Sequence, residues 1–120
     1  MEYTLSGTSC KWSFAKEDSD VIIVNSDEEL QLYITSAPDE LFPSVDFTKY
    51  TMIIAHGGTP QGIYETMIES FKRSSETEYA LNIIVAMTMT DAPELWTKAL
   101  LVDKWDKLYN VGLNVDVRES

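Results

Sequence analysis

Cys10 and His56 are the only thiol and the only imidazole in the chain, so nucleophilic catalysis is the first chemistry to consider. A thiol becomes a strong nucleophile when a neighbouring imidazole takes its proton. The separation of the two residues in the sequence neither favours nor opposes such a pair, and a lone cysteine is ordinarily a packed core residue. One cysteine and one histidine also fall short of the ligand set of a zinc site. We therefore predict no catalytic residue, no metal site and no cofactor.

His56 also begins a segment rich in glycine, HGGTPQGIY. Gly57 and Gly62 have the spacing of a phosphate-binding loop, but Ile63 and Tyr64 stand where lysine and a hydroxyl belong. Residues 56–62 are instead predicted to be a hairpin loop, in which glycines supply positive φ and a proline fixes a bend. We predict that this loop is exposed and contacts a partner. The predicted binding residues are His56, Gly57, Gly58, Thr59, Pro60, Gln61, Gly62 and Tyr64.

Charge limits the possible partners. Twenty acidic residues against nine basic ones give a formal net charge of -11, which repels phosphate backbones and anionic headgroups. No apolar run approaches the length needed to span a bilayer. The sequence therefore predicts no nucleic-acid partner and no transmembrane segment. Its 120 residues are expected to form one domain, residues 1–120.

Alternating apolar residues predict the principal strands. Leu81, Ile83 and Val85 share one parity in a segment from 79 to 90, which is expected to be a central strand. Residues 111–117 repeat the pattern and are expected to form a half-buried antiparallel strand. Further strands are predicted at 20–25, 50–55 and 63–72, and a first strand around residues 10–14.

One segment has the signals of a helix. Ser26 can cap the amide of Glu29, while acidic residues at 27–29 lie against the positive end of the helix dipole. The helix is predicted to run from about 27 to 36. Residues 95–105 are ambiguous, because their local spacing slightly favours a helix. The predicted fold class is α+β, a mostly antiparallel sheet of five to seven strands with one main helix.

Three segments in order resemble a known family: VIIVNSDEELQLYI, FPSVDFTKYTMIIAHGG and GIYETMIESF. Together they resemble the domain at the C-terminus of the protease complex subunit PrcB and related small envelope proteins of Bacteroidetes. The resemblance implies an α+β domain that acts by contact with a partner in the cell envelope, and it implies a strand at 95–105. In the best-matching part, Phe47 is expected to fill the core and Asp46 to cap a turn through its side chain.

The sequence thus predicts a non-catalytic interaction module, with a protein or peptide as its partner. Two alternatives stay open. One is a small enzyme that uses Cys10 with His56 or carboxylates in a cleft. The other is a structural subunit that pairs through a sheet edge. The envelope or periplasm is the compartment that the resemblance implies, and the cytoplasm stays open with the oligomeric state.

Overall fold

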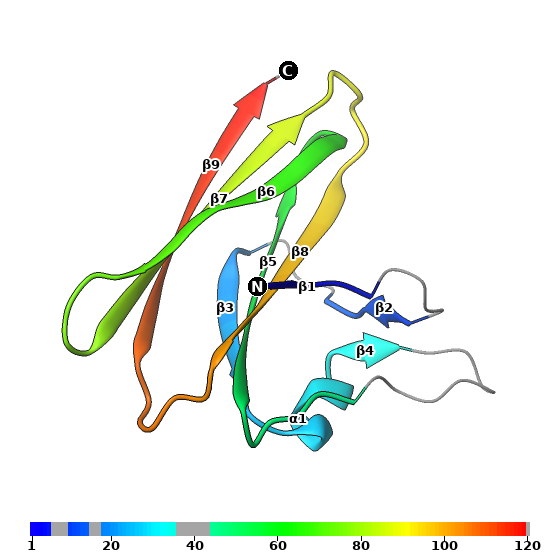
Figure 1. The fold of residues 1–120 in the computed structure, drawn as a ribbon. Helices are drawn as coiled ribbons and strands as arrows, with labels where there is room; N and C mark the ends of the chain where they lie inside the picture. The colour runs from blue at the N-terminus through cyan, green and yellow to red at the C-terminus, as the bar shows by residue number, and fades with distance from the viewer. Residues whose placement is uncertain (6–9, 15–17, 36–43, 120) are drawn as a thin grey trace.

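The computed structural model describes residues 1–5, 10–14, 18–35 and 44–119, and its strands form three sheets (Figure 1). The first sheet has the order β1-β8-β5-β3, and the second has the order β6-β7-β9. A third sheet is the two-stranded pair β2-β4. The elements in these ranges are β1 Glu2–Tyr3, β2 Lys11–Trp12, β3 Asp20–Val24, α1 Asp27–Gln31, β4 Ile34–Thr35, β5 Tyr50–Thr59, β6 Ile63–Arg73, β7 Glu78–Met87, β8 Glu94–Asp103 and β9 Asn110–Glu119.

Strand β5 lies at the centre of the molecule, because successive side chains along it face two separate cores. Met52 and Ile54 face one core, which we call the short-element core because α1, β2 and β4 cover it. Ile53 and Ala55 face the other, which we call the inter-sheet core because the second sheet covers it. The run of apolar residues at 52–55 is therefore explained by burial on both faces.

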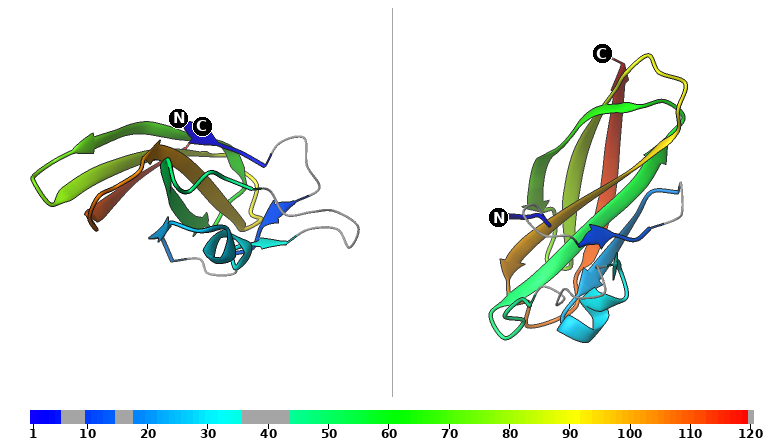
Figure 2. Two further views of the ribbon diagram at one scale, coloured as in Figure 1. Left: turned by 60° about the horizontal axis from the view of Figure 1, so that its bottom comes forward. Right: turned by 90° about the vertical axis from the view of Figure 1, so that its right-hand side faces the viewer.

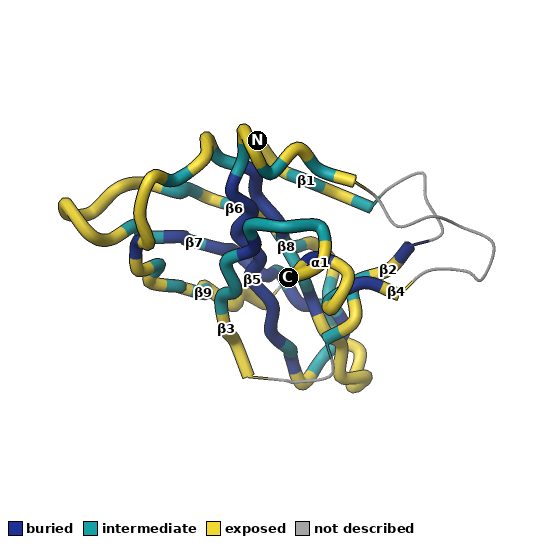
Figure 3. The backbone as a smooth tube through the Cα atoms, turned by 90° about the horizontal axis from the view of Figure 1, so that it is seen from below, coloured by how far each residue is buried: buried dark blue, intermediate teal, exposed yellow. Residues whose placement is uncertain are grey.

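The layers are visible in two views. Figure 2 shows β6 and β7 arching over one side of β5 and β8, with α1, β2 and β4 on the other side. Figure 3 shows that the buried backbone is concentrated in β5, β8 and the middle of β7. Leu81, Ile83 and Val85 point from β7 into the inter-sheet core, as their alternation predicts. The prediction of a central strand is confirmed, since β7 lies between β6 and β9.

The main helix is much shorter than predicted. Ser26 caps it as expected and accepts a hydrogen bond from the Glu29 amide at 3.1 Å. The helix ends at Gln31 instead of continuing to 36, because Ile34 and Thr35 pair with β2. Only Leu30 of this helix is buried, so a single turn suffices to place one apolar side chain in the short-element core.

The glycine segment is not a hairpin turn. Residues 56–59 continue β5, while β5 and β6 belong to different sheets, so the chain crosses between layers at 60–62. Neither Gly57 nor Gly62 has a positive φ; both are required for space. A Cβ on Gly57 would lie 2.9 Å from the Trp96 ring, and one on Gly62 would lie 2.7 Å from the Thr88 hydroxyl.

Two other strand predictions have different outcomes. Residues 94–103 form strand β8, as the resemblance implies and against the local helical spacing. The predicted C-terminal strand exists as β9, but it runs parallel to β7, not antiparallel. Every other strand pair in the described residues is antiparallel, so the sheets are mostly antiparallel. Local alternation predicts which face of a strand is buried, but it carries no information about the direction of its neighbour.

Candidate functional site

The predicted binding residues lie in three different settings. His56 is buried, with 4% of its surface exposed, and is on the same face of β5 as Met52 and Ile54. The next three residues, 57–59, are buried or half-buried in the same strand. Pro60 is exposed at the crossing, and Tyr64 is 72% exposed at the start of β6. Between them, Gln61 is half-buried and Gly62 is buried, so of the predicted binding residues only Pro60 and Tyr64 are fully exposed.

His56 lines a cavity of about 550 Å³, which we call the His56 cavity. Its volume is within the usual range for small-molecule binding sites. Two parts of the chain that are far apart in sequence complete it: residues 13–14 and 18–22 on one side, and residues 32–33, between α1 and β4, on the other. The lining residues are Ser13, Phe14, Asp18, Ser19, Asp20, Ile22, Leu32, Tyr33 and His56.

Three stacked rings form one wall of this cavity. Phe14 lies between Tyr33 and His56, with ring centroids 5.4 Å and 4.3 Å away and interplanar angles of 11° and 10°. A backbone hydrogen bond joins the two segments that carry Phe14 and Tyr33: the Ser13 amide donates to the Tyr33 carbonyl at 2.8 Å. Stacked aromatic pairs add stability beyond the area that they bury. The rings therefore give the cavity a preorganised apolar wall.

Two carboxylates give the same cavity its charge. Asp20 lies directly opposite His56 in the antiparallel pair of β3 and β5, so both side chains are on one face of the sheet. One oxygen of Asp20 accepts a hydrogen bond from the Val21 amide at 2.8 Å. Asp18 is exposed and makes no hydrogen bond or ion pair with any other described residue. The described residues lining this cavity include these two carboxylates and no lysine or arginine.

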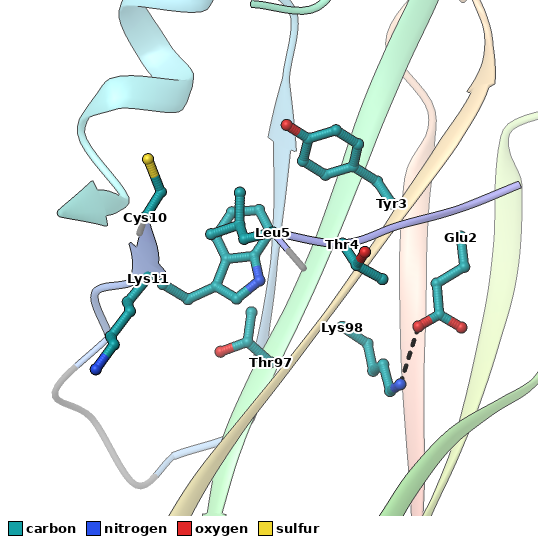
Figure 4. Close-up of a pocket in the computed structure, with 9 residues that line it drawn as sticks. Glu2, Tyr3, Thr4, Leu5, Cys10, Lys11, Thr97 and Lys98 are labelled. Carbon is teal, nitrogen blue, oxygen red and sulfur yellow. Dashed lines mark hydrogen bonds and ion pairs between the residues drawn. The ribbon is translucent and has the colours of Figure 1, made fainter. Parts of the chain in front are cut away.

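Cys10 belongs to a second cavity, of about 340 Å³. Figure 4 shows its thiol at one end and the ion pair between Lys98 and Glu2 at the other, where Nζ and Oε2 are 2.9 Å apart. Burial raises the pKa of the Tyr3 hydroxyl here, and electrostatic interactions with Cys10 and Asp27 raise it further. His56 does not line this cavity. The structure therefore assigns the thiol and the imidazole to different cavities.

A second group of carboxylates lies near the start of α1. Asp27 accepts hydrogen bonds from the Ser44 hydroxyl and the Val45 amide, at 3.1 and 3.0 Å. Asp46 accepts from the Thr48 hydroxyl and amide, which lower the pKa of Asp46. These contacts confirm the predicted turn at Asp46, and Phe47 packs against the short-element core as expected. These two carboxylates therefore have structural partners: Asp27 connects the start of α1 to residues 44–45, and Asp46 stabilises its own turn.

The corner at residues 60–62 is attached to the connection between β7 and β8. The Gly62 amide donates to the Thr90 carbonyl at 3.0 Å, and the Ile63 amide donates to Glu94 Oε2 at 2.9 Å. Large apolar side chains are exposed on these adjoining segments, including Tyr64 at 72% and Met89 at 88%. Tyr64 therefore has the exposure that the sequence predicted for a contact residue.

Sequence reasoning included His56 in the binding set but missed the other residues of its cavity. No motif in the sequence marks Phe14, Tyr33, Asp18 and Asp20 as members of one site. No spacing rule connects these residues, because β3 and β5 meet through a register that forms only in the folded sheet. The one available signal was the polar histidine at the end of an apolar strand.

Within the described residues, no group of three or more histidine, cysteine, aspartate or glutamate side chains is arranged to hold a metal ion. Among the helices in these residues, none has the length and apolar character that crossing a bilayer requires. Comparisons with family models, with curated proteins and with solved structures find no match to the chain. What the chain binds must therefore be inferred from its own side chains.

Proposed function

We propose that the chain is a non-catalytic protein-binding module whose His56 cavity receives a basic side chain of its partner. The observation that carries this proposal is the composition of the cavity: a wall of stacked rings beside two carboxylates, with no lysine or arginine among its described lining residues. An ammonium or guanidinium group is attracted both to carboxylates and to aromatic faces. The rest of the molecule adds to this field, because the net charge is -11.

The shape of the cavity suits a long basic side chain. Lysine and arginine place an aliphatic stem along apolar surface while their charged end stays near polar groups. Ile22 and Leu32 offer that apolar surface, and Asp18 and Asp20 are placed to meet the charge. Leu32 is 73% exposed at the edge of the cavity, where it can contact the backbone of the partner. A partner segment with one inserted lysine or arginine would use all of these groups.

A catalytic role has less support from the geometry. The enzyme alternative needs the Cys10 thiol within reach of the His56 imidazole. The two residues line different cavities, and His56 instead stacks against Phe14. The resemblance to small envelope proteins also favours binding without catalysis. The cell envelope stays part of the proposal, as the compartment that this resemblance implies.

The test is a titration with short peptides, followed by amide chemical shifts of the ¹⁵N-labelled protein. The probes are three Gly-Ser heptapeptides with a central lysine, arginine or glutamate. We expect the lysine and arginine peptides to shift amides of 18–22, 32–33 and 56, and the glutamate peptide to shift none. The double variant Asp18→Asn/Asp20→Asn should weaken binding by about tenfold or more, because it removes both charges that face the ligand.

A matched control separates local from overall charge. The variant Asp91→Asn/Asp103→Asn removes the same two charges at exposed positions outside the cavity. If it weakens binding as much as the first double variant, the cavity is not the site. If Tyr64→Ala abolishes binding while the Asp18/Asp20 variant retains it, the contact lies at the corner near residues 60–64. If none of the three peptides binds, the proposal for a basic side chain is wrong.

A further inference from the structure

The edges of the second sheet differ in how well they are protected against pairing with another strand. Strand β6 has two register irregularities against β7, between Ile63 and Glu65 and between Ile68 and Ser70. Bulges of this kind and charged side chains are the usual protection of an exposed edge. Strand β9 pairs with β7 through ten consecutive positions without any irregularity. In the part of the chain that the structure describes, no strand pairs with the other side of β9.

Few charged side chains protect β9, and all three lie in its last four residues: Asp116, Arg118 and Glu119. The stretch from 110 to 118 contains one acid and one base, Asp116 and Arg118, which form an ion pair with Nη2 and Oδ2 2.7 Å apart. This stretch is therefore neutral in a chain with a net charge of -11. Its core-facing side also carries Val117, which is 46% exposed at the outer edge of the sheet. Figure 1 shows β9 along this outer edge.

A row of polar side chains crosses the outer face of the second sheet and ends at β9. The Asn82 amide donates to the Ser70 hydroxyl at 2.8 Å, and the Asn114 amide donates to the Asn82 carbonyl oxygen at 3.0 Å. These residues occupy matched positions on the three strands. Asn114 is exposed at the end of the row, and its own carbonyl oxygen can accept a further hydrogen bond.

We propose that two copies of this chain pair through β9, antiparallel about a two-fold axis at Asn114, to form one continuous six-stranded sheet. A two-fold axis places the same strand on both sides of the interface, and it requires opposed residues to have numbers of equal parity. With the axis at Asn114, the two Asn114 side chains lie opposite each other and join the polar rows of both copies. This proposal uses an edge of the second sheet and does not depend on the His56 cavity.

The other residue pairs that this register creates are compatible with antiparallel pairing of the two β9 strands. Val111 lies opposite Val117 of the other copy, which covers the exposed valine. Asp116 lies opposite Gly112, and Arg118 lies opposite Asn110, so no like charges face each other directly. Nine of the ten residues of β9 then pair, residues 110–118. A register centred at Val115 also pairs nine residues, 111–119, but in it the two Asn114 side chains no longer lie opposite each other; registers centred further toward either end pair fewer residues of the described strand.

The test combines oligomeric state with a crosslink that depends on register. Sedimentation over a wide concentration range should show a monomer–dimer equilibrium, and the dimer should strengthen with salt because both copies carry the same net charge. Oxidation of Asn114→Cys should give a disulfide dimer, since opposed Cα atoms lie within the limit of about 7 Å for a disulfide. In Asp116→Cys, the two cysteines would be four residues out of register, about 13 Å apart, and should not crosslink. The native chain, with Cys10 4% exposed, gives the background.

A charge variant tests the same axis without cysteine chemistry. Asn114→Lys places two lysines opposite each other, and the dimer should weaken by about tenfold. Gln31→Lys adds the same charge at an exposed position on α1, and should leave the dimer unchanged. The proposal is overturned by a monomer at every concentration. It is also overturned by a dimer that crosslinks at position 116 as readily as at 114, or by one that Asn114→Lys does not weaken.

Discussion

The two faces of β5 are covered by very different structures, although adjacent residues of one strand supply both. On one side, Ile53 packs against the second sheet, whose three strands have ten or eleven residues each. On the other side, Ile54 packs against two-residue strands and a single helical turn. Both isoleucines are fully buried. The faces therefore differ in what holds their neighbours in place, not in how completely they exclude water.

This difference explains where a cavity of mixed chemistry can form. Long paired strands present regular rows of side chains that fill the space between the sheets. Short elements leave irregular gaps, and polar groups from their connections can reach into these gaps. The His56 cavity and the Cys10 cavity are both lined by residues at or beside such short elements. The inter-sheet face supplies stability, and the short-element face supplies the candidate site.

The largest expected effect compares truncation on the two faces. Ile53→Ala should lower the free energy of unfolding by about 4 kcal/mol, and Ile54→Ala by about 2.5 kcal/mol, within the range for buried isoleucine. The reason is that the long strands of the second sheet are fixed by many backbone hydrogen bonds and cannot move into the new cavity. The short elements α1, β2 and β4 have fewer such bonds and can move into it. Urea unfolding followed by tryptophan fluorescence measures both values. An equal or larger loss for Ile54→Ala would contradict the proposed difference between the faces.

The sequence predicts the inter-sheet face of β5 better than it predicts the short-element face. The strands of the inter-sheet face were predictable, because Leu81, Ile83 and Val85 alternate over a long stretch and the alternation survives in the structure. On the other face, the cap at Ser26 was predicted correctly, but the helix end was not. Residues 34–35 pair with β2, which lies more than twenty residues away, and local signals do not report such pairing.

The candidate site was predictable only in part, for a related reason. His56 was recognisable as an unusual polar residue after an apolar run, but its partners depend on long-range contacts. Phe14 reaches it from the segment that follows β2, and Asp20 reaches it through the β3–β5 register. The turn predicted at 56–62 failed because glycine signals either a bend or close packing. The position of Trp96 decides between them at Gly57.

The second prediction tests that close packing at the inter-sheet face. Gly57→Ala should destabilise the protein by about 2 kcal/mol, because the new methyl group overlaps the buried Trp96 ring. Gly112→Ala is the matched control in β9, where the nearest atom to the new methyl group is 3.9 Å away. Its effect should stay within about 0.5 kcal/mol. If both variants unfold at the same urea concentration, Gly57 is not required for space.

The third prediction concerns the short-element face. Ser26→Ala should cost about 1 kcal/mol, because it removes the acceptor for the Glu29 amide at the start of α1. Ser26→Asp should retain most of the stability, since aspartate accepts the same hydrogen bond. Thermal unfolding of the three proteins provides the comparison. Equal losses for alanine and aspartate would show that the cap does not stabilise this helix.

The smallest expected effect is a dependence on pH, also on the short-element face. Burial raises the pKa of Tyr3 above its ordinary value of 10.0, so the unfolded chain loses this proton at lower pH than the folded chain does. The contribution of Tyr3 to the free energy of unfolding is therefore complete below pH 10.0, and it is lost as pH rises through the pKa of Tyr3 in the folded protein. Tyr3→Phe removes the hydroxyl while keeping a ring against Trp12, so its unfolding free energy should fall less steeply than that of the native chain above pH 10.0. Parallel slopes for the two proteins in urea unfolding would mean that the folded environment of Tyr3 does not disfavour its charge. The short-element face would then be more open to water at Tyr3 than the burial of Cys10 beside it indicates.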